Sequence, residues 1–388
     1  MGNGNTISNV NLNDGSDEDA DIYNAAGLFG YVKNGTINNV HVSNVNIVSA
    51  SGNVAGIAGK IEGASISNCT ASGTISGQTY SGSFDGKTFG GIVGSATSSK
   101  IEGCTNNTSL ISEKNGIGGI VGLATNSTEI SGCVNNAAIQ GGCQVGGIVG
   151  SLQTGSISSC INNGAVSLKG AETHVFNESG FGGIVGVASQ SSLISECENN
   201  GTVTAVDQLL VGGIAGTIRQ GSDIHTCTNT GNVTGSENVG GIVGAGVVNS
   251  SSSGDEPYYS VSGCSNTGVI TGTTNVGGII GSSAATVASI SEKGIEIINN
   301  SNSGSVQGTT NVGGIVGINN NASSTDTTAV ATQVTGNLNT GNVPEGAGTI
   351  VGNNNGTDAT VGVVQNNFWP EELGTNAYWQ RSWFQWIW

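Results

Sequence analysis

A six-residue block of the form apolar-Gly-Gly-Ile-Val-Gly recurs along the chain, and this repetition limits the fold more than any other feature. Eight copies are close to that form, and three diverged copies bring the total to eleven. Successive copies lie 28 to 37 residues apart. Their last glycines are Gly30, Gly59, Gly94, Gly122, Gly150, Gly186, Gly216, Gly244, Gly281, Gly317 and Gly352. A chain of this kind is a stack of similar units, each contacting its neighbours.

A second block follows each glycine block and keeps fixed spacings. Seven of the eight cysteines share one position, with Ile or Val three residues before it and a further aliphatic residue six after it. These are Cys69, Cys104, Cys133, Cys160, Cys197, Cys227 and Cys264, and Asn300 and Asn337 take the position in later units. Asparagine stands two residues after the cysteine position, at Asn106, Asn135, Asn162, Asn199, Asn229, Asn266, Asn302 and Asn339, with Ala71 as the exception.

Each unit therefore contains three short apolar segments separated by Gly, Asn, Ser and Thr. Glycine and β-branched residues disfavour helices, and no segment has the helical i, i+3, i+4 pattern. We predict an all-β fold, a parallel β-solenoid of about eleven coils with three short strands per coil, in which coils stack ~4.8 Å apart. The recurring asparagine predicts an amide ladder at a turn, where Asn tolerates the left-handed conformation. The Gly-Gly pair predicts a sharp bend.

These residues resemble the GLUG-motif repeat family, whose Gly-Leu-x-Gly core is matched by Gly27-Leu28-Phe29-Gly30-Tyr31 and by the later Gly-Ile-Val-Gly blocks. Residues 37–47 are also similar to that family's first unit. The resemblance covers residues 5–369. It implies a bacterial surface protein, because such repeats occur in adhesin-like chains and in stalks of secreted peptidases. It implies no catalytic residues.

Charge and hydropathy exclude several functions. The chain has 9 Lys and Arg against 26 Asp and Glu, a net charge of −17, which argues against nucleic acid and against anionic membrane surfaces. No apolar run approaches the ~18 residues that a membrane span requires, so we expect no membrane insertion. The first residues lack the basic and apolar regions of a signal peptide. We expect an extracellular or cell-surface protein whose signal and anchor lie outside this chain.

The cysteine position has three interpretations. The favoured one is a ladder of small buried thiols, since free cysteine packs as a compact hydrophobe. Disulfides along the stack are a second, although in-register side chains ~4.8 Å apart do not face one another as a disulfide requires. A metal site is a third, and it lacks support because there is no Cys-x-x-Cys pair and the three histidines occupy unrelated positions. Cys143 stands outside the register, and we expect it to be the exposed, reactive thiol.

Other candidate chemistry is sparse, and we predict no catalytic residue, no metal and no cofactor. Acidic residues cluster at Asp14, Asp17, Glu18, Asp19 and Asp21, without the spacing of a calcium-binding EF-hand, and we expect a solvated loop there. The sequence contains no nucleophile elbow, zinc-protease motif or P-loop lysine.

The lengthened units suggest where binding occurs. Insertions at 245–260, 282–294 and 318–332 fall in successive coils and should emerge side by side from one corner, whereas those at 77–88 and 168–180 leave from another. Loops on a rigid scaffold commonly carry binding residues. The aromatic residues Tyr80, Phe176, Tyr258 and Tyr259 are therefore our candidates for contacting a glycan or a host-surface ligand. The alternative is that these rings fold back on their own coils.

Both ends of the chain are unusual. Ile7, Val10 and Leu12 match the second half of a unit, so we expect an incomplete first coil and a chain that is a fragment of a longer one. We divide the chain into a solenoid, residues 1–369, and a Trp-rich tail, residues 370–388. The tail's Trp379, Trp383, Phe384, Trp386 and Trp388 would cap the last coil or dock on another molecule.

The function predicted is that of a non-enzymatic surface protein, an adhesin-like stalk or fibre element. A self-assembling head-to-tail filament subunit is the first alternative. A polysaccharide-active β-helix enzyme is the second, and it rests on fold analogy alone.

Overall fold

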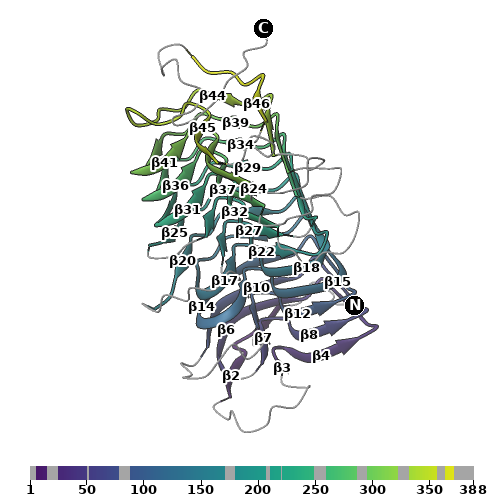
Figure 1. Cartoon of the computed structure of the whole chain (residues 1–388). Coiled ribbons are helices and arrows are strands. Elements are labelled where there is room, and N and C mark those ends of the chain that lie inside the picture. The colour runs from purple at the N-terminus through teal and green to yellow at the C-terminus, as the bar shows by residue number, and fades with distance from the viewer. Residues whose placement is uncertain are drawn as a thin grey trace.

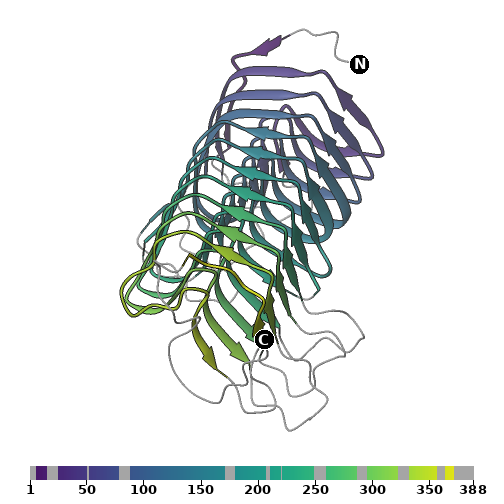
Figure 2. The same ribbon diagram turned by 90° about the horizontal axis from the view of Figure 1, so that it is seen from above.

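The protein is a parallel β-solenoid, as the sequence predicts (Figures 1 and 2). The computed structural model describes residues 6–14, 25–49, 52–77, 88–170, 180–206, 210–219, 221–248, 259–285, 295–321, 332–355 and 363–370. These residues form strands and turns and no helix. The strands run across the rod, and the chain advances along it from the first coil at one end to the last at the other (Figure 2). They belong to two sheets, here named sheet A, of 26 strands, and sheet B, of 20 strands.

Sheet A contains three columns of strands. The first comprises β1 (Thr6–Ser8), β6 (His41–Ser49), β10 (Thr70–Gly77), β14 (Thr105–Gly118), β16 (Val134–Asn135), β19 (Ile161–Asn162), β24 (Glu198–Asn199), β29 (Thr228–Asn229), β34 (Ser265–Asn266), β39 (Ser301–Asn302) and β44 (Leu338–Asn339). The second comprises β2 (Asn11–Asp14), β17 (Ile139–Gly146), β20 (Val166–Leu168), β25 (Val203–Ala205), β30 (Val233–Gly235), β35 (Ile270–Thr271) and β40 (Val306–Gln307). The third comprises β3 (Ala25–Ala26), β7 (Asn53–Ala55), β11 (Thr88–Gly90), β21 (Phe181–Gly182), β26 (Val211–Gly212), β31 (Glu237–Gly240), β36 (Thr274–Gly277) and β41 (Thr310–Gly313).

Sheet B contains two columns. The first comprises β4 (Phe29–Lys33), β8 (Ala58–Glu62), β12 (Val93–Thr97), β15 (Val121–Ser131), β18 (Val149–Ser158), β22 (Val185–Ser189), β27 (Ala215–Arg219), β32 (Val243–Val248), β37 (Ile280–Ala285), β42 (Val316–Asn321) and β45 (Val351–Asn355). The second comprises β5 (Thr36–Asn38), β9 (Ser65–Ser67), β13 (Lys100–Glu102), β23 (Leu193–Ser195), β28 (Asp223–His225), β33 (Ser260–Ser262), β38 (Glu296–Ile298), β43 (Gln333–Thr335) and β46 (Val363–Gln365).

Pairing between coils places like residues over like. Ile194 of β23 pairs with Ile157 on one side and Ile224 on the other, and the ladder residue Asn199 pairs with Asn162 and Asn229. Side chains alternate between the interior and solvent, so the aliphatic registers form one continuous buried core. The three apolar segments of each unit resolve into up to five short strands, because turns and the glycine pair interrupt them.

The left-handed turn residue is not the ladder asparagine, and this part of the prediction is wrong. None of the ladder asparagines has a positive φ; the residue directly before the cysteine register has one in every coil, with φ between 50° and 70°. That register holds Asn39, Asn68, Gly103, Gly132, Ser159, Glu196, Thr226, Gly263, Asn299, Gly336 and Asn366. It turns the chain from sheet B to sheet A, and this leaves the asparagine in an ordinary extended strand with its side chain inside.

The Gly-Gly pair is required by close packing. A Cβ atom on Gly119, for example, would collide with the carbonyl oxygen of Gly147 in the next coil and with the side chain of Asn135. Glycine therefore lets the buried amide ladder lie directly against the main chain. The bend predicted at this position needs no positive φ, since φ is positive at neither Gly118 nor Gly119.

The first residues described form half a coil. β1 and β2 pair in register with β6, so that Ile7 lies beside Val42 and Leu12 beside Ile47. The insertions leave the rod where the sequence places them. Val248, Ala285 and Asn321 stand in one register at the ends of three adjacent strands of sheet B, whereas β10 and β20 precede the other two insertions and belong to sheet A.

Candidate functional site

The charged side chains described lie mainly on the outer face of sheet B. Lys33 forms an ion pair with Glu62 at 2.8 Å, and Lys100 forms one with Glu102 at 2.9 Å. Asp223 also lies here and accepts a hydrogen bond from the backbone N–H of Ser260. Burial raises the pKa of the Asp223 carboxyl.

The outer face of sheet A has a different character. It consists of the outward positions in the first two strand columns from Thr105 to Gln307, and we call it the amide face. Its residues are Thr105, Asn107, Ser109, Ile111, Val134, Asn136, Ala138, Gln140, Ile161, Asn163, Ala165, Ser167, Glu198, Asn200, Thr202, Thr204, Thr228, Thr230, Asn232, Thr234, Ser265, Thr267, Val269, Thr271, Ser301, Ser303, Ser305 and Gln307. Glu198 is the single charged side chain among them, and the exposed Glu113, the next outward residue of β14, lies at their border. The amide face is thus almost neutral on a chain with a net charge of −17.

A ladder of side-chain hydrogen bonds crosses the amide face. The amide nitrogens of Asn136, Asn163 and Asn200 each donate to the asparagine of the preceding coil, at 3.0, 2.9 and 3.1 Å, and Thr230 donates to Asn200 at 2.7 Å. These side chains are exposed. They fix a row of amide and hydroxyl groups at the coil spacing of ~4.8 Å.

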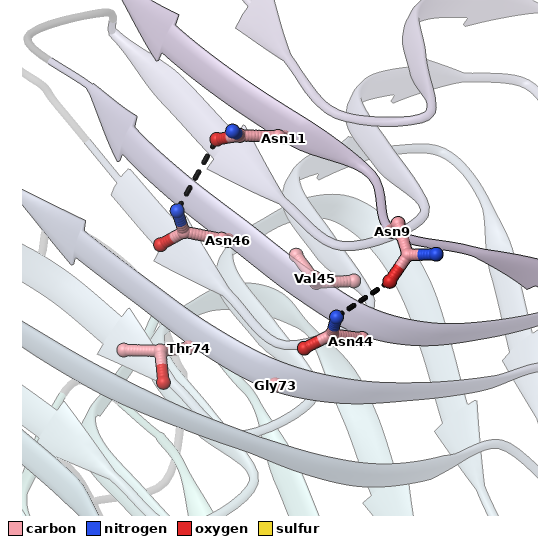
Figure 3. A pocket seen from close by; sticks show the side chains of 7 residues that line it. All are labelled: Asn9, Asn11, Asn44, Val45, Asn46, Gly73 and Thr74. Atoms are coloured by element: carbon pink, nitrogen blue, oxygen red, sulfur yellow. Dashed lines mark hydrogen bonds between the residues drawn. The ribbon is translucent and has the colours of Figure 1, made fainter.

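A groove lies near the first coil, on the same side of sheet A (Figure 3). Its lining residues are Asn9, Asn11, Asn44, Val45, Asn46, Gly73 and Thr74. It arises from a β-bulge, because β6 has two residues, Ser43 and Asn44, where β10 has only Ser72. Asn44 adopts φ = 54°, and Asn9 of the preceding half-coil adopts φ = 61°.

The groove offers amide groups held in fixed positions. Asn44 donates to the Asn9 amide oxygen at 2.6 Å, and Asn46 donates to the Asn11 amide oxygen at 3.2 Å (Figure 3). The Asn9 nitrogen and the Asn44 oxygen do not take part in that bond and can bind a ligand hydroxyl. Because the lining contains no titratable side chain, the groove can bind by hydrogen bonding but offers no general acid or base.

Two buried ladders support this surface from inside. The amides of Asn106, Asn135, Asn162, Asn199, Asn229, Asn266, Asn302 and Asn339 form an unbroken series, each donating to the next at 2.7 to 2.9 Å. Each also donates to the carbonyl oxygen two residues further on, as Asn162 does to Gly164 at 2.8 Å. The amide ladder predicted from the sequence is therefore confirmed, in the interior of the solenoid.

The cysteine register forms the second ladder. Its seven thiols are free and at most 1% exposed. The backbone N–H of Cys133 donates to the sulfur of Cys160 at 3.4 Å, and that sulfur donates to the carbonyl oxygen of Ser158 at 3.3 Å. Asn337 makes the same two kinds of bond, since it accepts from the Asn300 N–H at 2.9 Å and donates to Thr335 at 3.2 Å. This shared pattern explains why asparagine replaces cysteine in the later coils.

Comparison with known families identifies the repeat. The family model described as the GLUG motif matches residues 50–76 and 207–234. These two segments are GLUG repeats. Each matched GLUG segment contains a glycine block, an Ile-x-x-Cys block and the aliphatic residue six positions after the cysteine, which together make up one coil of the solenoid. Neither the curated proteins nor the solved structures compared with the chain include a match.

One predicted binding residue of the GLUG solenoid lies in its interior. Tyr259 is 1% exposed, and its hydroxyl donates to Ser283 at 2.8 Å, so its prediction as a ligand contact is wrong. The ring occupies space left by Gly246, which stands where the preceding coil has Ile218; a Cβ atom on Gly246 would overlap that ring. Burial raises the pKa of Tyr259. Tyr80, Phe176 and Tyr258 lie outside the described residues.

The prediction for Cys143 is also wrong. This thiol is fully buried. The register between β14 and β17 shifts between Ser112 and Asn115, and after the shift Cys143 stands opposite Asn115 within the sheet. Nothing in the glycine-rich surroundings of Cys143 marks it as interior.

The acidic cluster and the tail fall largely outside the described residues. Asp14 ends β2, and Asp17, Glu18, Asp19 and Asp21 are not described. Trp379, Trp383, Phe384, Trp386 and Trp388 are not described either. Trp369 is described and packs partly buried against the core, one residue after Phe368, which bridges to Leu338. The backbone N–H of the last ladder asparagine, Asn339, donates to the carbonyl oxygen of Phe368 at 2.9 Å.

Two kinds of feature are absent from the described part of the solenoid. No three of its His, Cys, Asp and Glu side chains converge where they could hold one metal ion. None of its segments is a helix long and apolar enough to cross a membrane.

Proposed function

We propose that this chain is a non-enzymatic extracellular or cell-surface protein, an adhesin-like rod that binds neutral glycans through the amide face and the adjoining groove. The observation that carries the proposal is the separation of charge between the two sheets. Sheet B holds the ion pairs Lys33–Glu62 and Lys100–Glu102, whereas the amide face presents hydroxyl and amide groups. An uncharged polymer rich in hydroxyl groups matches such a surface without leaving a buried unpaired charge.

Two further features support the proposal. The groove amides are held by hydrogen bonds to one another, which lowers the entropy lost when they bind a ligand. All eight cysteines are buried, and burial protects thiols from the oxidation that an extracellular location would otherwise favour.

The test is binding of dextran and of a soluble β-glucan to the full chain, measured by affinity electrophoresis. The double variant Asn44→Gly/Asn46→Ala removes two exposed hydrogen-bonding groups from the groove without straining the left-handed position 44, at about 0.5–1.5 kcal/mol each, and should weaken binding about tenfold. The matched control is Ser65→Ala/Ser67→Ala, on the outer face of sheet B. An equal effect of both variants, or none, contradicts the proposal.

A second candidate function is that of a head-to-tail filament subunit. It is favoured by strands at both ends of the rod that pair on one side only within the described residues. β1, β2, β4 and β5 have partners only towards the next coil, and β45 and β46 only towards the preceding one. Such parallel edges of equal cross-section can stack on one another.

Negative-stain electron microscopy distinguishes the two functions. A filament subunit should form fibres that Ile7→Lys shortens, because Ile7 lies in β1 at the open edge and is 42% exposed. Single rods at every concentration, with or without the substitution, contradict the filament function and leave glycan binding to be judged by its own assay.

A further inference from the structure

The buried thiol column has a geometry that suits a metal ion held by two ligands. Cys69, Cys104, Cys133, Cys160, Cys197, Cys227 and Cys264 occupy seven successive coils. Coils of a solenoid are ~4.8 Å apart. A metal–sulfur bond is about 2.3 Å long, so a linear sulfur–metal–sulfur unit spans about 4.6 Å. An ion between two adjacent coils would therefore need almost no movement of the sulfurs.

The column cannot supply more than two sulfurs to any one ion. The thiols lie in a single line, and no three acidic, histidine or cysteine side chains converge anywhere in the described part of the rod. Tetrahedral ions such as zinc, which need four ligands, are therefore not satisfied. Soft ions that accept two thiolates in a line are the class that fits.

The charge of the ion narrows the class of metal ions further. The thiols are surrounded by the aliphatic register three residues earlier and by the amide ladder, and they are at most 1% exposed. A net charge in this buried column would be energetically unfavourable, because no opposite charge pairs with it. Two thiolates and a divalent ion are neutral together, whereas two thiolates and a monovalent ion carry a charge of −1.

A metal-bound sulfur would lose its bond to a carbonyl oxygen, such as that from Cys160 to Ser158 at 3.3 Å, but would keep the bonds that it accepts from the backbone. The N–H groups of Cys104, Cys133 and Cys197 donate to the sulfur of the next coil, each at 3.4 Å, and these bonds do not require the thiol proton.

We propose that the thiol column is a binding site for soft divalent ions of linear coordination, with the mercuric ion as the representative, each ion held by the thiols of two adjacent coils. Binding breaks two S–H bonds, forms two sulfur–metal bonds and releases two protons, with no oxidation or reduction. Each ion uses two thiols, so seven thiols hold three ions. If two ions shared one thiolate, two divalent ions would be bound by three thiolates, and this group would carry a net positive charge.

Two variants with equal numbers of thiols test the role of adjacency. Cys104→Asn/Cys160→Asn/Cys227→Asn removes alternate thiols and leaves no two in neighbouring coils. Cys69→Asn/Cys227→Asn/Cys264→Asn leaves four neighbouring thiols, Cys104 to Cys197. Asparagine is chosen because Asn300 and Asn337 occupy this register in the later coils with the same hydrogen bonds.

The native full-length proteins are incubated with mercuric chloride, desalted and analysed for bound mercury, and X-ray absorption counts the sulfur ligands. The wild type should take up three ions in the column, the variant with neighbouring thiols two and the alternate variant none, with Cys143 contributing equally to all three. Zinc chloride should not bind. The wild-type melting temperature should rise with mercury, since the ion binds the folded state. Equal uptake by the two variants, or a lower melting temperature, overturns the proposal.

Discussion

The most direct test of the fold is to remove one rung of the buried amide ladder. Asn199 donates to Gly201 at 2.9 Å and to Asn229 at 2.7 Å, and it accepts from Asn162 at 2.8 Å. Asn199→Ala leaves three fully buried partners without these bonds. Each unsatisfied buried group costs about 1–3 kcal/mol. Asn162 keeps its bond to the Gly164 carbonyl, so we expect a loss of about 4 kcal/mol in the free energy of unfolding.

The adjacent residue provides the control. Asn200 also takes part in a ladder, donating to Asn163 at 3.1 Å and accepting from Thr230 at 2.7 Å, but it points to solvent. Water replaces its bonds, so Asn200→Ala should cost no more than about 0.5 kcal/mol.

Urea unfolding monitored by circular dichroism measures the two losses, and hydrogen exchange locates them. Because each coil contacts only its neighbours, Asn199→Ala should accelerate exchange in β19, β24 and β29 and leave distant coils unchanged. Equal losses in the two variants, or a loss below about 1 kcal/mol for Asn199→Ala, would refute the argument that burial gives the inner ladder its strength.

Three further predictions follow from individual side chains. Tyr259→Ala should lower the free energy of unfolding by about 3–5 kcal/mol, because it empties the space beside Gly246, whereas a change below about 1 kcal/mol would place the ring at the surface. Thiol titration with a chromogenic disulfide should find no fast-reacting cysteine in the native protein and eight after unfolding; one fast native thiol would mean that Cys143 is accessible. Thr226→Gly should raise the free energy of unfolding by about 1 kcal/mol, because a β-branched residue is strained at φ = 56°. Gly263→Thr, in the same register, should lower the free energy of unfolding. Effects of the opposite sign would contradict the assignment of this register as the left-handed turn position.

The sequence predicts the solenoid and its ladders because both depend on repeated residue types. Asn162 and its equivalents recur at one spacing, and only stacking in register explains that recurrence. The turn residue escapes detection because Gly, Asn, Ser, Glu and Thr all occupy it, as Ser159, Glu196 and Thr226 illustrate. The position is defined by backbone conformation and not by side-chain chemistry.

The candidate site was less accessible from sequence. The sequence places Tyr259 in a loop, because the space beside Gly246 that holds its ring forms only when the coils are stacked. The sequence pattern does not reveal the amide face either, because its residues alternate with buried ones and are spread over seven units. The difference in charge between the two outer faces becomes apparent only when the outward residues of sheet A are compared with those of sheet B. The groove depends on a single extra residue in β6, which no repeat pattern reveals.

The stacking of coils determines how the rod responds to tension. The hydrogen bonds between coils, such as that from Ile214 to Ile242 at 2.9 Å, run along the rod axis, whereas the strands lie across it. A pull on the two ends therefore loads the bonds of the outermost coil first and peels it away before the next. A unit of 28 residues contributes ~4.8 Å when stacked and about 95 Å when extended. Under load the molecule would lengthen in discrete steps, each absorbing work, and would behave as a shock absorber rather than a stiff rod.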